Sequence, residues 1–202
     1  MKMNTMTFRS LTMLAFSLLI FSCNGKKEQQ TEETNEETVV EQDSLLPLNR
    51  LNLPEGFKIE IYAKGLDGAR SMAMGDDGTL FVGTRREGNV YAVKDTDGDY
   101  KADKMWTIAS GMTLPNGVAF KDGSLYLADV SRLLKYNNIE NELDNPSEPE
   151  LIYDDYPEAL HHGWKYIAFG PDDKLYVPVG APCNICDSTM VDERYATNTR
   201  MN

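Results

Sequence analysis

The chain has 202 residues, of which 41% are hydrophobic and 26% charged, and its formal net charge is −12 at pH 7. This length fits one ordinary domain or part of a larger one. The acidic excess argues against nucleic acid as a partner, because neutralising phosphates requires a surplus of Lys and Arg, and against a basic membrane-surface patch. Three cysteines are too few for a disulfide scaffold.

The first 22 residues resemble a lipoprotein signal peptide. Lys2 and Arg9 precede an apolar stretch at 11–21, which is shorter than the roughly 20 residues that span a bilayer. The tetrapeptide that ends at Cys23 resembles a bacterial lipobox, which implies cleavage before Cys23 and a lipid on its sulfur. An ordinary signal peptide with an incidental cysteine is the alternative. We therefore expect a location in the bacterial cell envelope, with a lipid as the only membrane anchor, facing the periplasm or the cell surface.

Residues 23–49 are predicted to be a lipidated cysteine followed by a disordered acidic tether. Residues 26–49 contain seven acidic residues, two lysines and almost no apolar side chain before Leu45. Such a segment cannot bury enough surface to offset its ordering entropy. Lys2 and Arg9 contribute +2 and the tether −5, which leaves −9 for the folded part at 50–202.

The folded part repeats one pattern three times, at 71–84, 117–129 and 166–180: an apolar strand, an acidic turn and a second apolar strand. Asp-Gly between two such runs predicts a β-hairpin. The third copy has Asp172-Asp173-Lys174 at this place and must turn without glycine.

Further strands are expected at 89–93 and 132–136, and no long stretch has a helical period. All-β repeats about 45 to 50 residues apart predict the blades of a β-propeller; a β-sandwich is the alternative. Three blades are fewer than the typical four to eight or so of a closed propeller. We therefore expect a truncated sequence that stops at Asn202 in mid-pattern, without a closing strand.

Aligning the copies on their turns predicts which residues meet near the propeller axis. The alignment superposes one apolar residue from each first strand: Met74, Phe120 and Phe169. Because first strands line the central channel, the residues four positions earlier should converge near its mouth, unless these positions are merely exposed: Arg70, Asn116 and Lys165.

The same hairpin geometry predicts that residues 161–164 face residues 180–184, since a hairpin's first strand starts where its second strand ends. The first of these segments contains His161 and His162, the only histidines in the sequence. Histidine is the usual general base near neutral pH, although a pair of histidines can also be structural or merely exposed.

The sequence at 161–186 and 194–197, together with 54–66, 68–85 and 114–120, resembles the glucose/sorbosone dehydrogenase family. This resemblance implies a six-bladed quinoprotein propeller that uses pyrroloquinoline quinone (PQQ) and Ca²⁺, of which residues 50–202 would be the N-terminal half. The run 180–184, Gly-Ala-Pro-Cys-Asn, favours the L-sorbosone dehydrogenase-like branch.

The resemblance implies oxidation of an aldose sugar or sorbosone, in which a histidine takes a proton, hydride passes to PQQ, and Ca²⁺ polarises the quinone. The motif places this base at His162. The soluble glucose dehydrogenases of this family carry Asp where this chain has Ala181, which leaves the orientation of the base open. The electron acceptor is unspecified, and later PQQ and Ca²⁺ ligands would lie beyond Asn202. Together with the register, this predicts the cofactor-binding residues His161, Arg70, Asn116, Trp164, Lys165 and Asn184.

Cys183 and Cys186 form a C-x-x-C motif. If Cys23 is lipidated, these are the remaining thiols, and an oxidising compartment favours a disulfide between them. Asp187 follows where haem attachment requires histidine, and a zinc site would need His161 and His162 as further ligands.

A second acidic motif spaces Asp95, Asp97, Asp99 and Asp103 at positions 1, 3, 5 and 9, which resembles the start of an EF-type calcium loop. Glycine stands at position 4 rather than 6, and no Glu stands at position 12. The motif predicts a structural Ca²⁺ site, with a solvated acidic turn as the alternative.

Three classes of function are thus open. The first is a lipid-anchored quinoprotein dehydrogenase, and the second is a non-enzymatic propeller lipoprotein that binds a glycan or a protein. The third is a metal-dependent, lactonase-like propeller, against which the cationic Arg70 and Lys165 near the axis argue.

Overall fold

The computed structural model describes residues 46–187 and 192–201. The predicted lipidation site, Cys23, and most of the predicted tether lie outside these residues. Residues 48–202 form a compact unit, which begins with a short 3-10 helix, η2 (Leu48–Arg50). Within the described part of the chain, no helix is both long enough and apolar enough to cross a membrane.

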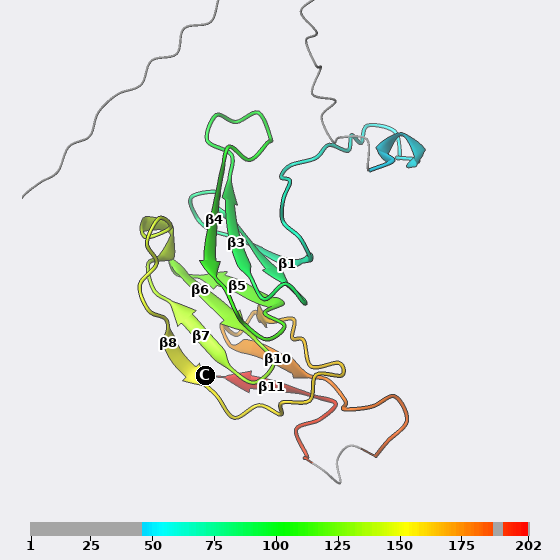
Figure 1. Ribbon diagram of the computed structural model, residues 1–202, viewed down its shortest axis with the longest axis vertical. Coiled ribbons are helices and arrows are strands. Elements are labelled where there is room, and N and C mark those ends of the chain that lie inside the picture. The colour runs from blue at the N-terminus through cyan, green and yellow to red at the C-terminus, as the bar shows by residue number, and fades with distance from the viewer. Residues whose placement is uncertain (1–45, 188–191, 202) are drawn as a thin grey trace, which may run out of the picture. The chain divides into compact units, whose positions relative to one another are not determined.

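The strands of this unit form three antiparallel sheets, in each of which neighbouring strands follow one another in sequence (Figure 1). The first sheet consists of β1 (Ala69–Met74), β2 (Leu80–Thr84), β3 (Val90–Lys94) and β4 (Lys104–Ala109). The second consists of β5 (Gly117–Lys121), β6 (Ser124–Ala128), β7 (Leu133–Tyr136) and β8 (Glu150–Tyr153), with η3 (Ile139–Asn141) between its last two strands. The third consists of β9 (Ala168–Phe169), β10 (Leu175–Val179) and β11 (Thr197–Met201).

The first strand of each sheet packs against the first strand of the next, β1 against β5 and β5 against β9. Successive meanders arranged around their innermost strands are the blades of a β-propeller. The described residues thus contain three blades, and the all-β prediction is confirmed.

The strand register agrees with the sequence alignment. Met74 pairs with Leu80, Phe120 with Leu125, and Phe169 with Leu175. The three hairpins are therefore equivalent, so that equivalent positions at their ends lie at the same edge of each blade.

The turns differ in how they reach the left-handed backbone conformation. In the second hairpin, Asp122 and Gly123 both have positive φ, 49° and 72°, as a type I′ turn requires. The third hairpin lacks a glycine at the position of Gly78, so Asp173 adopts φ 60° where Gly78 has φ 81°. Aspartate tolerates this conformation better than most residues because its short polar side chain can bond locally.

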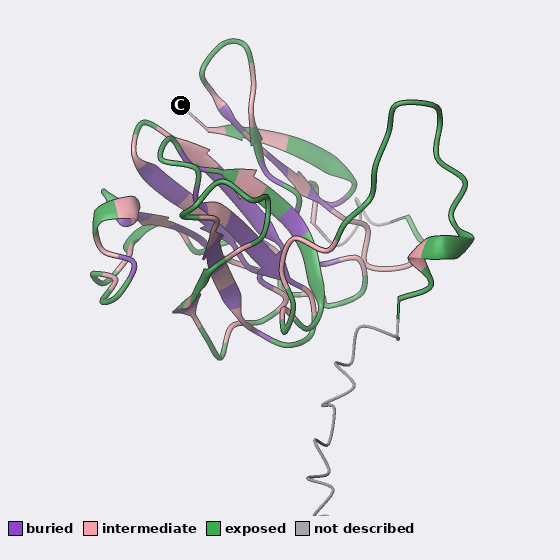
Figure 2. Cartoon of the chain, turned by 90° about the horizontal axis from the view of Figure 1, so that it is seen from above, coloured by how far each residue is buried: buried purple, intermediate pink, exposed green. Residues whose placement is uncertain are grey.

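Two hydrophobic clusters hold the blades together. One joins blades 1 and 2, where the rings of Phe81 and Phe120 stack with centroids 5.6 Å apart. The other joins blades 2 and 3, where Leu133 packs with Ile167 and Val177. Figure 2 shows the buried positions concentrated on the strands and the exposed ones on the loops.

The sequence analysis missed the outermost strand of each blade, β4, β8 and β11. The strand that follows the third hairpin was among those missed, and every residue of β11 pairs with β10. These strands are largely exposed, as in β8, where Glu150, Leu151 and Ile152 are all exposed. They therefore lack the alternation of buried and exposed residues that reveals a half-buried strand.

Candidate functional site

The three hairpins have two ends with different character. One end holds the acidic turns. At the other end β1, β5 and β9 begin and β2 and β10 finish, and we call it the open edge. A hollow of about 730 Å³ lies there, and its lining comes from all three blades: Ala69, Arg70, Ser71, Met72, Asn116, Trp164, Tyr166 and Pro178.

Two of the three residues predicted to converge, Arg70 and Asn116, line this hollow. Asn116 is only 4% exposed, and its Nδ2 donates to the backbone carbonyl of Lys165 at 2.5 Å. Its Oδ1 is buried and has no hydrogen-bond partner within the described structure. A buried acceptor without a donor is costly, and Asn116 thus offers a bonding position to a ligand with an O–H or N–H group.

Lys165 lies beside Asn116 as the register predicts, but its side chain does not line the hollow. Successive residues of an extended chain point to opposite faces, so Trp164 and Tyr166 face the hollow while Lys165 points between the blades. Lys165 is 1% exposed, and its Nζ lies over the ring of Tyr156, 4.8 Å from the centroid. This burial lowers the pKa of the amine from 10.5 to about 8, against the opposing influence of Asp129.

His162 is held in an uncommon backbone conformation. Its φ is 54°, in a turn that closes with the Gly163 amide donating to the Leu160 carbonyl at 3.1 Å. Gly180 makes this position possible, because a Cβ there would lie 2.1 Å from the His162 carbonyl oxygen. Strained backbone of this kind is often found at functional sites.

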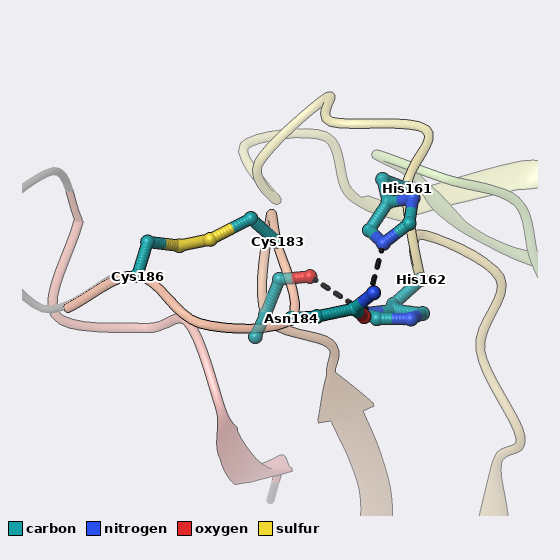
Figure 3. Close-up of a disulfide and its surroundings, with 6 residues drawn as sticks. His161, His162, Cys183, Asn184 and Cys186 are labelled. Carbon is teal, nitrogen blue, oxygen red and sulfur yellow. Dashed lines mark hydrogen bonds between the residues drawn. A yellow bond between two sulfur atoms is a disulfide. The ribbon is translucent and has the colours of Figure 1, made fainter.

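The ring of His162 is oriented by the residue that follows Gly180. Its Nδ1 lies 3.2 Å from the backbone carbonyl oxygen of Ala181 (Figure 3). A carbonyl oxygen can only accept, so Nδ1 carries the proton in the neutral imidazole and Nε2 keeps a free lone pair. The backbone of Ala181 therefore orients the imidazole without a side-chain carboxylate.

The predicted contact between residues 161–164 and 180–184 is confirmed. His161 Nε2 lies 3.4 Å from Asn184 Oδ1, and the two histidine rings have centroids 4.0 Å apart. Cys183 and Cys186 are joined by a disulfide that closes the same loop (Figure 3). None of these five residues lines the hollow, but His162 stands beside it, because its ring centroid lies 6.0 Å from that of Trp164, which does line it.

Arg85, at the end of β2, belongs to the open edge and was not singled out from the sequence. Its guanidinium carbon lies 3.7 Å from the ring centroid of Trp164, which makes Trp164 the link between blade 1 and His162. Applying to the first hairpin the geometric rule that paired 161–164 with 180–184 would have identified Arg85, because it follows the second strand of that hairpin.

The acidic loop between β3 and β4 lies away from this site (Figure 1). Carboxylate oxygens of Asp95, Asp97 and Asp99 lie within 4.8 Å of one another. Asp103 is engaged differently, because its Oδ2 accepts from the Thr96 amide at 2.6 Å, and this bond lowers its pKa. The Gly98 amide, which donates to Asp95, is the main cause of that residue's lowered pKa. Ca²⁺ at this loop stays a prediction.

The fold and the open edge define a β-propeller protein with a rim site built from three blades. No known family model matches the chain. It is 26% identical over 146 residues to an uncharacterized protein of Borreliella burgdorferi, covering 67% of this chain and 37% of that one.

Solved structures share the fold at low sequence identity. The PQQ domain of pyranose dehydrogenase from Coprinopsis cinerea is 14% identical with a TM-score of 0.59, and 69% of this chain covers 34% of that one. The PQQ-bound aldose sugar dehydrogenase of Streptomyces coelicolor is 21% identical (TM-score 0.56; 71% and 47% covered). A carbohydrate-active enzyme of family AA12 from Trichoderma reesei, a calcium structure, is 16% identical (TM-score 0.63; 73% and 38% covered). The chain thus spans between a third and a half of the length of these proteins.

Proposed function

We propose that this protein contributes to the PQQ-dependent oxidation of a sugar, an aldose or sorbosone, with His162 as the general base. One observation carries the proposal: the Ala181 carbonyl holds His162 with Nε2 free, on the rim of a hollow lined by aromatic and polar side chains. The proteins of similar fold include the PQQ domain of a pyranose dehydrogenase and a PQQ-bound aldose sugar dehydrogenase, which favours this chemistry over a simple binding role.

The hollow fits a planar, polar cofactor. Trp164 and Tyr166 contribute aromatic side chains, Arg70 contributes positive charge, and Asn116 Oδ1 is an acceptor that lacks a donor within the described residues. When bound, PQQ supplies a two-electron acceptor for hydride. The hollow does not fit Ca²⁺ by itself, because no carboxylate is among its lining residues, and Ca²⁺ prefers oxygen ligands that include carboxylates.

The protein's own residues have distinct parts in this reaction. His162 Nε2 accepts the proton of the sugar hydroxyl, while Nδ1 keeps its bond to Ala181. Trp164 lines the hollow next to His162, with the two ring centroids 6.0 Å apart, and Arg85 packs on its ring from blade 1. The disulfide between Cys183 and Cys186 constrains the turn that carries Asn184, whose side-chain oxygen lies 3.4 Å from His161 Nε2.

We also propose that the protein is exported and held in the cell envelope by a lipid on Cys23. The charged residues and short apolar stretch before this cysteine support this location. Labelling with a radioactive fatty acid tests it: the label is expected on the wild type and not on Cys23→Ser. Label that persists on Cys23→Ser would contradict the anchor.

The test of function compares the two neighbouring histidines in the full protein, loaded with PQQ and Ca²⁺ and supplied with an artificial electron acceptor and an aldose or sorbosone. We expect His162→Gln to lower kcat by about 10²- to 10⁴-fold, the usual contribution of a general base. His161→Gln, which removes a ring 4.0 Å away, is the matched control and should change kcat far less. Equal effects of the two variants, or no stoichiometric binding of PQQ, would overturn the proposal.

A further inference from the structure

Three arginines meet on the blade 1 side of the open edge. Arg70, Arg85 and Arg86 line a second hollow of about 260 Å³ together with Gly68, Ala69 and Glu87. This hollow adjoins the larger one, because Ala69 and Arg70 line both.

None of the three guanidinium groups has an ion pair or a hydrogen bond to any other residue that the structure describes. The nearby carboxylate, Glu87, accepts from the backbone amide of Arg86 at 2.9 Å. Unpaired arginines are unexpected here, since residues 50–202 carry a formal charge of −9 and acidic partners are plentiful. Like charges gathered in one hollow repel one another, and Glu87 is the one carboxylate among the residues that line it.

The lack of a hydrogen-bond acceptor is clearest at Arg85. Its guanidinium lies against the indole of Trp164 at 3.7 Å, and stacking of this kind leaves the N–H donors in the guanidinium plane available. Its Nε is buried and has no hydrogen-bond partner within the described residues. A buried charged donor without an acceptor is costly, and planar arginine donors match a carboxylate in two-point contacts.

We propose that Arg70, Arg85 and Arg86 form a subsite for a carboxylate group of the ligand that occupies the hollow beside Trp164. The presence of Glu87 in the same hollow favours a singly charged carboxylate over a doubly charged phosphate. The carboxylate belongs either to the substrate, as in a sugar acid, or to PQQ, which is itself a carboxylic acid. This inference rests on the proposed function, because that proposal makes the larger hollow a ligand site.

The test is calorimetric binding, which requires no turnover. The full protein is titrated with D-galacturonate, with D-galactose as the neutral match, and with PQQ. We expect galacturonate to bind at least about tenfold more tightly than galactose, as a charged hydrogen bond predicts. Arg70→Gln and Arg85→Gln should each remove most of this preference, while Arg50→Gln removes the same charge from an exposed residue outside both hollows and should leave it intact.

Arg85→Lys is the control that separates weaker binding from a folding defect, because lysine keeps the positive charge but lacks the planar guanidinium group. It should melt like the wild type and still bind galacturonate more weakly. If galacturonate shows no preference but PQQ binding falls in the same variants, the subsite holds and the cofactor supplies the carboxylate. If neither ligand depends on Arg70 or Arg85, the subsite is overturned. Galacturonate binding that depends on them while PQQ fails to bind would uphold the subsite and reject the proposed function.

Discussion

The two ends of the same three hairpins are built in contrasting ways. At the turn end, blades are tied by charged contacts: Glu140 of blade 2 accepts from the amides of Asp77 and Thr79 in blade 1, and Lys121 pairs with Asp173 of blade 3 at 2.6 Å. At the open edge, by contrast, polar groups are left over. Blades are in contact at both ends, since Asn116 and Arg85 also reach blade 3 at the open edge, but there both bridging residues keep a buried polar atom that has no partner among the described residues.

Most of the buried polar atoms that lack a partner within the described residues lie at the open edge. Of the three buried side-chain atoms without a partner in the described residues, two lie there, on Arg85 and Asn116, while the third is Thr79 Oγ1 at the turn end. Gly180 is also there, where a side chain would collide with His162. A site that needs strain and unpaired donors has to be supported by stronger packing elsewhere.

The largest expected effect on stability comes from Lys165, whose amine is buried between the blades. Its folded pKa, about 8, lies below the ordinary value of 10.5, so the folded protein binds fewer protons than the unfolded chain between these values. The free energy of unfolding should therefore rise with pH from about 8 to 10.5, by up to about 3 kcal/mol. Urea unfolding across this range measures it.

Lys165→Met, which keeps the apolar stem without the amine, is the control for this rise. It should be more stable than the wild type at pH 7, and its unfolding free energy should lose the rise between pH 8 and 10.5. An equal rise in both proteins would show that the buried amine is not its source.

Gly180→Ala and Gly78→Ala compare the two ends directly. At Gly180 the new Cβ would meet the His162 backbone, and we expect a loss of about 2 kcal/mol, as for overpacking, together with loss of PQQ binding. At Gly78, φ is 81° but no atom lies within 4 Å of a new Cβ, so we expect about 1 kcal/mol of backbone strain and unchanged binding. Equal loss of binding in both variants would remove the distinction between the ends.

Glu140→Gln tests the tie at the turn end. The variant keeps the shape of the side chain but loses the charge that strengthens its bonds to the amides of Asp77 and Thr79. We expect a loss of about 1 kcal/mol in unfolding free energy with no change in ligand binding. Thermal melting and the galacturonate titration check both parts, and weakened binding would contradict the separation of the two ends.

The smallest effect is expected at the acidic loop. If Asp95, Asp97 and Asp99 bind Ca²⁺ with the millimolar affinity typical of exposed sites, millimolar Ca²⁺ should stabilise the wild type by about 1 kcal/mol or less. Asp97→Ala should abolish the calcium-dependent shift in Tm, and EDTA should reverse it in the wild type. Identical shifts in both proteins would leave the loop as a solvated turn.

The hairpins were predictable because their alternating apolar residues and acidic turns are local features of the sequence. Because Leu80, Leu125 and Leu175 are equivalent, the limits of the third hairpin could be read from the sequence. These limits predicted that the histidine pair lies opposite Gly180. The direction of Lys165 was not predictable in the same way, since β9 pairs through only two residues, too few to show which face the preceding residues take.

Contacts between blades also could not be predicted from the sequence. The stacking of Arg85 on Trp164 joins residues 79 positions apart whose meeting depends on how the blades pack. The role of Ala181 escaped notice because it is played by a backbone carbonyl, which every residue type carries. The outer strands were missed because exposed strands show little pattern.

The central claim is that the open edge presents His162 with Nδ1 protonated and Nε2 free. Nitrogen NMR of protein labelled at histidine tests it directly, because the sequence has only two histidines and His161→Gln assigns their signals. The account predicts that neutral His162 has its proton on Nδ1. A proton on Nε2 would show that the Ala181 carbonyl does not orient the ring, and His162 could not then act as the proposed base.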